Sequence, residues 1–221
     1  MIYITGDTHG NFRDFSERIH SKSVKRGDIV IVCGDFGFLW GDQMHNYYLQ
    51  MLKFEPYTIL FVDGNHENFD MLNEYPVTEW NGGKVHKIHE NVYHLMRGQV
   101  FEIENKKFFT FGGAYSIDKS MRRENISWWK EELPTNEDYD TAKANLEKCG
   151  YKVDYVITHT IPQSAIHRLS KVPDPHDAEL TGYFEWLYNN LEFTKWYAGH
   201  FHTNMLINDN LQILYGLIQE V

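Results

Sequence analysis

Residue types that ligate metals recur in five short segments of the chain, and each segment follows an apolar run. The segments are Gly6-Asp7-Thr8-His9-Gly10, Gly34-Asp35, Gly64-Asn65-His66-Glu67, Thr158-His159-Thr160 and Gly199-His200-Phe201-His202. Because apolar runs of this length predict β-strands, each segment should lie at the C-terminal end of a strand. Open α/β folds bind their ligands at that edge. We therefore expect the five segments to converge on one rim.

The converging residues have the chemistry of a two-metal site. They offer two carboxylates, one amide oxygen and four imidazoles, from Asp7, His9, Asp35, Asn65, His159, His200 and His202. His66 and Glu67 stand beside them as supporting candidates. This set is sufficient for two divalent cations that share a carboxylate. Because it offers nitrogen and oxygen but no thiolate, the set suits manganese, iron, zinc or cobalt. Ligand type alone does not choose among these metals, and we expect manganese first.

Such a centre suits the hydrolysis of phosphate esters. The oxygens of a phosphate ester repel a nucleophile, so a catalyst must neutralise their charge and supply hydroxide at neutral pH. Two metals can do both, since they bind phosphoryl oxygens and lower the pKa of a bridging water toward about 7. Two carboxylates leave two dications with a net positive charge, so we expect the pocket to attract anions.

Composition narrows the possible partners. The 221 residues carry a formal net charge of −10, which argues against an extended nucleic-acid groove and leaves a small phosphorylated substrate as the expected partner. We expect a single domain over residues 1–221. Cys33 and Cys149 lie far apart and lack zinc-site spacing, which favours reduced thiols. With no leader and no apolar run near the roughly 20 residues of a membrane span, we expect a cytoplasmic location and no membrane partner.

The first third of the chain alternates strand and helix. Short β-branched runs predict strands, and apolar residues three and four positions apart predict helices. The predicted elements are strand 2–5, helix 12–19, strand 29–33, helix 43–52 and strand 58–62. This βαβαβ order predicts a parallel sheet with right-handed crossovers.

The rest of the chain predicts shorter strands and two more helices. Apolar runs broken by turn residues indicate a β-meander between residues 85 and 113. The later elements are strands 92–95, 100–103 and 108–111, helix 137–148 capped by Thr135 or Asn136, strand 155–157, helix 180–190, strand 196–198 and a hairpin around 208–210. We predict a mostly two-sheet α/β sandwich that carries its loops on one rim.

The five segments form an ordered series of motifs: Asp-x-His, Gly-Asp, Gly-Asn-His-Glu, Thr-His and Gly-His-x-His. This series resembles that of the calcineurin-like metallophosphoesterase superfamily. The series spans Asp7 to His202, nearly the whole chain. The resemblance implies a two-sheet β-sandwich flanked by helices, in an αββα arrangement. It also implies hydrolysis of phosphate mono- or diesters by a bridging hydroxide on a dinuclear centre.

Carried over by position, the resemblance also implies residue roles. Asp7, His9, Asp35 and His202 would hold the first metal. Asp35 as the bridge, Asn65, His159 and His200 would hold the second. His66 would lie beside the leaving group as general acid or charge stabiliser.

Two departures separate this chain from the protein-phosphatase and dinucleoside-tetraphosphatase branch. That branch has an Asp-Arg pair after its Gly-Asp motif and an arginine before Gly-Asn-His-Glu, where this chain has Phe36 and Asp63. We therefore rank that activity below a generic phosphoesterase.

Asp63 or Glu67 could orient His66, and Arg122 or Arg123 could reach phosphate from a rim formed by residues 118–135. A non-catalytic metal-binding scaffold of the same fold is the other alternative. The sequence leaves the oligomeric state open.

Two further groups of residues have simpler explanations. His86, His89 and His94 fall in the predicted meander, where we expect them to face solvent rather than bind a further metal. Trp128-Trp129 is expected to anchor a polar insertion on the sandwich rather than to stack on substrate.

Overall fold

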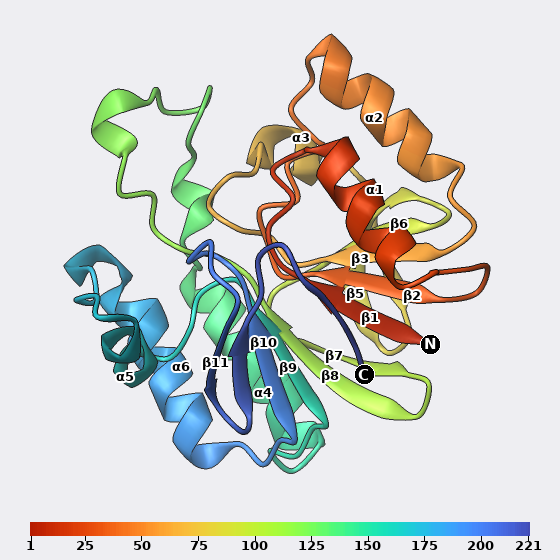
Figure 1. The fold of residues 1–221 in the computed structure, drawn as a ribbon. Coiled ribbons are helices and arrows are strands. Elements are labelled where there is room, and N and C mark those ends of the chain that lie inside the picture. Colours follow the sequence, from red (N-terminus) through yellow and green to blue (C-terminus); the bar gives the residue numbers. More distant parts are fainter.

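Two β-sheets pack against each other, with helices on their outer faces (Figure 1). The computed structural model describes residues 1–221. The first sheet contains β1 (Ile2–Thr5), β2 (Ile29–Val32), β3 (Thr58–Phe61), β4 (Val77–Trp80), β5 (Gly83–His89), β6 (Val92–Leu95) and β13 (Ile218–Glu220). Their order is β13-β1-β2-β3-β6-β5-β4, and β1, β2, β3 and β6 run parallel.

The second sheet is also mixed. It contains β7 (Gln99–Ile103), β8 (Lys106–Phe111), β9 (Tyr155–Thr158), β10 (Lys195–Ala198), β11 (Met205–Asn208) and β12 (Leu211–Ile213). Their order is β11-β12-β10-β9-β8-β7, and β8, β9, β10 and β12 run parallel. The predicted α/β sandwich is confirmed.

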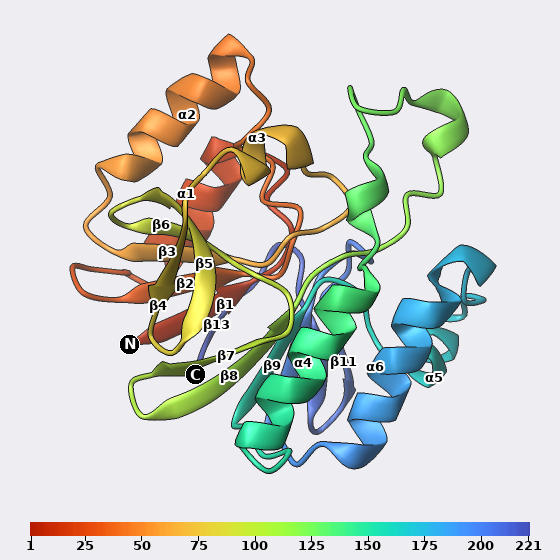
Figure 2. The same cartoon turned by 180° about the vertical axis from the view of Figure 1, so that it is seen from behind.

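The alternation of side chains along the strands explains the continuous apolar runs. On β2, Ile31 faces the core between the sheets, whereas Val30 and Val32 face the helices outside. The outer core of the first sheet packs under α1 (Phe12–Ser21), α2 (Gln43–Lys53) and α3 (Phe69–Asn73). Figure 2 shows α4 (Asn136–Lys148) and α6 (Ala178–Asn190) against the second sheet, and α5 (Gln163–Ile166) precedes α6. Strands buried on both faces must be apolar throughout.

The meander prediction was partly wrong. The predicted strands exist, but β6 pairs with β3 in the first sheet, whereas β7 pairs with β8 in the second. The chain changes sheets at Arg97-Gly98, where Gly98 has a φ of 72°. The predicted elements do not include β4, β13 or the short helices α3 and α5. Their periodicity is too brief to register, and the sheet that a strand joins depends on contacts distant in sequence.

Helix α4 begins as its capping residues require. The Thr135 side chain accepts from the Asp138 amide, and the Asp138 side chain accepts from the Thr135 amide, which makes Thr135 the N-cap. No helix in the structure combines the length and apolar character that crossing a bilayer would require.

Candidate metal centre

The loops that follow β1, β2, β3, β9 and β10 meet at one rim of the sandwich, as their sequence predicted (Figure 1). Backbone hydrogen bonds tie these loops together. The His9 amide donates to the Asp35 carbonyl at 2.8 Å, and the Gly199 amide donates to the His159 carbonyl at 2.9 Å. The seven predicted ligands are thereby held in two adjoining groups that share Asp35.

The first group consists of Asp7, His9, Asp35 and His202. One potential ligand atom from each of these four residues lies within 4.8 Å of every other. The Nε2 atoms of His9 and His202 are 2.9 Å apart, and His202 Nε2 is 3.2 Å from Asp7 Oδ2. Asp7 Oδ2 is buried and has no hydrogen-bond partner. A cation among these atoms would satisfy both imidazoles and the carboxylate, so the donor set fits a metal ion.

The second group consists of Asp35, Asn65, His159 and His200. Asn65 Oδ1 lies 3.1 Å from both His159 Nε2 and His200 Nδ1. Asp35 Oδ1 is 3.3 Å from His159 Nε2, whereas Asp35 Oδ2 is 3.7 Å from His9 Nε2 in the first group. His159 Nδ1 donates to the Cys33 carbonyl at 2.8 Å, which directs Nε2 toward Asn65. The two oxygens of Asp35 are thus divided between the groups.

The buried carboxylates produce a strongly negative environment. Burial works to lower the pKa of His159, but the charge of Asp35 outweighs it and raises the pKa to about 10. Burial also works to raise the pKa of Asp35, yet His159 holds it well below its usual range. Burial and the neighbouring His159 lower the pKa of His200 to about 3. The cluster therefore favours a bound cation, with His200 available as a neutral ligand.

The loop backbone is strained where it carries these side chains. His9, Asp35, His200 and His202 have φ values of 45°, 48°, 67° and 49°, in the left-handed region that non-glycine residues seldom adopt. Space beside them is also restricted. A Cβ at Gly64 would lie 2.0 Å from Asp35 Oδ1, and one at Gly199 would lie 2.1 Å from Asp7 Oδ1. Strain of this kind clusters at functional sites.

A model of the calcineurin-like phosphoesterase family matches residues 1–204. The chain belongs to this family. No curated protein matches it. Solved structures with some similarity include a phosphopantetheinyl hydrolase from Mycobacterium tuberculosis, at 16% identity and a TM-score of 0.49, covering 96% of this chain and 86% of that one. A sulfate thiohydrolase from Termus thermophilus has 11% identity and a TM-score of 0.44, covering 95% of this chain and 37% of that one.

His66 lies beside the centre of this family member and contacts the segment 114–135, which we call the lid. Its ring meets that of His9 edge to face, with centroids 5.3 Å apart. Arg122 Nη2 donates to His66 Nδ1 at 2.6 Å, and Arg122 Nη1 donates to Ser116 Oγ at 3.0 Å. Burial lowers the pKa of His66, and the Arg122 charge adds to that effect. The lid therefore contacts His66 through Arg122.

Neither acidic candidate for orienting His66 is free to do so. Asp63 accepts from Arg97 Nε at 2.9 Å and lies 3.1 Å from His94 Nε2. Glu67 accepts from the Phe36 amide at 2.7 Å and the Gly37 amide at 3.4 Å, and so holds the loop after β2. Burial raises the pKa of Glu67. The hydrogen bond to His66 comes from Arg122 instead, and no side-chain contact joins Arg123 to the site.

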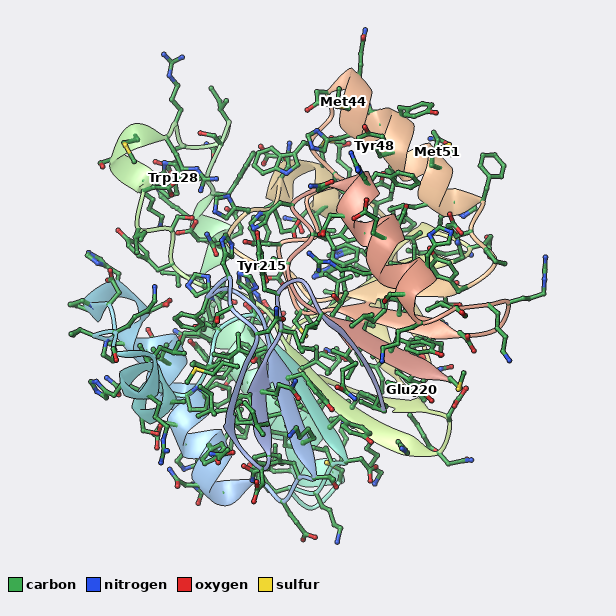
Figure 3. All side chains as sticks on the ribbon, in the orientation of Figure 1. Met44, Tyr48, Met51, Trp128, Tyr215 and Glu220 are labelled. Carbon is green, nitrogen blue, oxygen red and sulfur yellow. The ribbon has the colours of Figure 1, made fainter.

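Sequence reasoning missed two residues that support the ligands. Arg18 on α1 is buried and donates to the backbone carbonyls of Gly6 and Asp7 at 3.1 and 3.0 Å. The Tyr215 ring, labelled in Figure 3, stacks on His202 with centroids 4.6 Å apart. Arg18 falls at a polar position of an amphipathic helix, and Tyr215 follows the short strand β12. No local pattern distinguishes either from a surface residue.

The expectations for the tryptophan pair 128–129 and for the histidines of the meander had different outcomes. Trp129 is buried in the core of the first sheet and donates to Asp70 at 2.8 Å, so it is the anchor that we predicted. The expectation that His86 and His94 face solvent was wrong. Their Nδ1 atoms lie 2.9 Å apart across β5 and β6, and both side chains are buried. The hydrogen bond between the two rings and the contact of His94 with Asp63 compensate for their burial. An alternation of polar and apolar residues in the sequence cannot reveal such contacts.

Proposed function

We propose that this chain is a metal-dependent phosphoesterase that hydrolyses phosphate mono- or diesters at a dinuclear centre. The observation that carries the proposal is the division of Asp35 between two groups of ligands, with Oδ2 toward His9 and Oδ1 toward His159. A carboxylate with one oxygen toward each of two donor sets is suited to bridge two cations. Membership of the calcineurin-like phosphoesterase family supports the same reaction.

In this proposal, the two groups hold one divalent cation each. Asp7, His9, Asp35 and His202 bind the first, and Asp35, Asn65, His159 and His200 bind the second. When bound, the two cations would neutralise charge on the phosphoryl group and generate a nucleophile from water at neutral pH. The donor types suit manganese, iron, zinc or cobalt.

The contact between Arg122 and His66 supports a role for His66 at the leaving group. A guanidinium can only donate, so Nδ1 of His66 must accept from it. The proton of a neutral His66 ring then lies on Nε2. From there it can pass to the departing oxygen, which a poor leaving group requires. Arg122 would fix this tautomer and add positive charge nearby.

Metal reconstitution followed by a turnover assay tests the proposal. The protein would be stripped with a chelator, loaded separately with Mn²⁺, Fe²⁺, Zn²⁺ or Co²⁺, and assayed for bound metal and for hydrolysis of p-nitrophenyl and bis(p-nitrophenyl) phosphate. We expect two metals per chain and metal-dependent turnover of at least one ester. Full occupancy without turnover of either ester would instead favour the non-catalytic scaffold. Failure to bind two metals would contradict the dinuclear centre.

A further inference from the structure

Two hollows open from the candidate centre, and His66 lines both of them. The first, the wide cleft, has a volume of about 670 Å³ and reaches Asn65, His200 and His202. The second, the side pocket, has a volume of about 380 Å³ and reaches His9. Since His9 lines only the side pocket, whereas His200 and His202 line only the wide cleft, the hollows leave the centre on different sides.

The walls of the wide cleft suit a bulky organic group. Apolar side chains come from the lid and from the loop before α6, with Ile117 81% and Val172 86% exposed, and Phe201 adds an aromatic face. Lys171 Nζ lies 5.8 Å from the centre of the Phe201 ring and forms no ion pair. The apolar surface and the unpaired cation together favour a group with an apolar body and a polar or anionic end.

Apart from Asp35, the carboxylates of the wide cleft accept hydrogen bonds or form an ion pair. Asp118 lies 3.4 Å from Arg122 Nη1, and Asp174 accepts from the His176 amide at 2.8 Å. Asp177 accepts from the Tyr115 amide at 2.9 Å. The charge of Arg122 offsets that of Asp118, and the two backbone amides hold the carboxylates of Asp174 and Asp177 toward the backbone.

The side pocket is smaller and has an aromatic wall. It is lined by Trp40, Asp42 and His45 together with His9 and His66. His45 Nδ1 lies 2.5 Å from Asp42 Oδ2, which fixes the imidazole and leaves Nε2 as its other polar atom. The Trp40 ring packs against the ring of buried Trp129, with the ring centroids 5.6 Å apart. A flat ring or a short alkyl group could rest against Trp40.

From these two hollows we infer that the substrate is a phosphodiester, with its larger organic group in the wide cleft and its smaller one in the side pocket. This inference rests on the proposed function. A phosphate monoester carries one organic group and would occupy one hollow only. Both hollows fall within the range of roughly 300–1,000 Å³ that is typical of small-molecule sites. A diester uses both, because its phosphorus carries two organic groups.

Kinetics with matched esters test the inference. The fully metal-loaded wild type should hydrolyse bis(p-nitrophenyl) phosphate with a kcat/KM at least about 10-fold above that for p-nitrophenyl phosphate. Trp40→Ala and Ile117→Ala, one in each hollow, should each lower kcat/KM for the diester about 3- to 10-fold, as expected for a lost aromatic or aliphatic contact. At most one of them should lower kcat/KM for the monoester to the same extent, because the monoester fills one hollow. His45→Ala provides a second side-pocket variant if Trp40→Ala is unstable. Ile126→Ala, on the exposed part of the lid, is the control and should change neither ester.

Binding provides an independent readout. Diphenylphosphinate carries two rings on phosphorus and phenylphosphonate carries one, and neither contains an ester bond to hydrolyse. In titration calorimetry, Trp40→Ala and Ile117→Ala should each weaken binding of the two-ring anion, whereas at most one of them should weaken binding of the one-ring anion to the same extent.

The outcomes separate the two proposals. Preferred turnover of the monoester, or equal effects of both variants on the two esters, would overturn the diester inference while leaving a phosphoesterase intact. Failure of the loaded wild type to hydrolyse either ester would contradict the proposed function, and the inference with it.

Discussion

The loops at the strand ends and the lid border the same site but are built differently. The loops are short and mutually hydrogen-bonded, and they hold His9, Asp35 and His200 in left-handed backbone. The lid, residues 114–135, contains only short 3₁₀ turns and exposes Met121 and Ile126. Buried Trp129 anchors the lid to the core of the first sheet, and the ion pair between Lys119 and buried Glu132 joins two parts of the lid. The loops suit fixed metal ligands, whereas the lid brings one side chain, Arg122, to the catalytic candidate His66.

This comparison predicts that substitutions of the ligands in the loops remove metal, whereas substitutions of His66 and Arg122 spare it. The largest effect should come from Asp35→Asn. Because the bridging charge is lost, we expect metal occupancy to fall and kcat/KM to fall with it by about 10³-fold or more. Elemental analysis and the ester assay measure both. Asp28→Asn changes another buried carboxylate far from the rim and should retain metal. Two metals in Asp35→Asn would refute its bridging role.

The next effect should come from His66→Ala, which should keep both metals. Loss of a general acid typically lowers rates by about 10²–10⁴-fold, and alkyl esters should lose most because an alkoxide leaves poorly without a proton. Nitrophenyl esters should lose less, since nitrophenolate departs alone. Equal losses for both ester types at full metal occupancy would instead indicate that His66 positions the substrate.

A smaller effect is expected from Arg122→Ala. Its hydrogen bond to His66 involves a charged donor, and such bonds contribute about 1.5–3 kcal/mol, so kcat for alkyl esters should fall about 10- to 100-fold with metal retained. Much of this loss should disappear in the His66→Ala background if Arg122 acts through His66. Arg123→Ala, the adjacent arginine, is the matched control. A rise in KM without a change in kcat would point instead to ground-state binding of phosphate.

These predictions depend on the candidate ligands and on the contact between Arg122 and His66. The sequence alone could predict the place of the ligands but not this contact. The seven candidate ligands could be predicted to lie on one rim because each belongs to a short segment that follows an apolar strand. The contact between Arg122 and His66 joins residues 56 positions apart. Sequence could nominate Arg122 or Arg123 but could not choose between them. The partner of Asp63 and the sheet that β7 joins depend equally on distant contacts.

The smallest expected effect concerns the polar network that links the two regions. Arg97 donates to Asp63 beside the loop after β3 and to the Glu131 carbonyl in the lid, and His94 connects Asp63 to His86. Burial and the neighbouring His94 lower the pKa of His86 to about 4. The unfolded chain therefore binds more protons than the folded chain between about pH 4 and pH 6.5, and stability falls as the pH falls through this window.

Urea unfolding of the metal-free protein measures this effect. The free energy of unfolding should decline more steeply on acidification in the wild type than in His86→Gln, by at most about 1.4 kcal/mol per pH unit. Use of the metal-free form avoids a contribution from metal release. Identical pH dependence in the two proteins would contradict a buried neutral His86.

The left-handed backbone of the loops also has a consequence for the lifetime of the protein. Four of the seven proposed ligands adopt it, and each such residue costs roughly 1–2 kcal/mol. If bound metal offsets that cost as proposed, then copies without metal open more often and expose these loops to proteases. Limited proteolysis should cut the chelated protein faster than the loaded one, and first near the rim. Cellular abundance of the protein would then follow the supply of its metal, without any dedicated sensor.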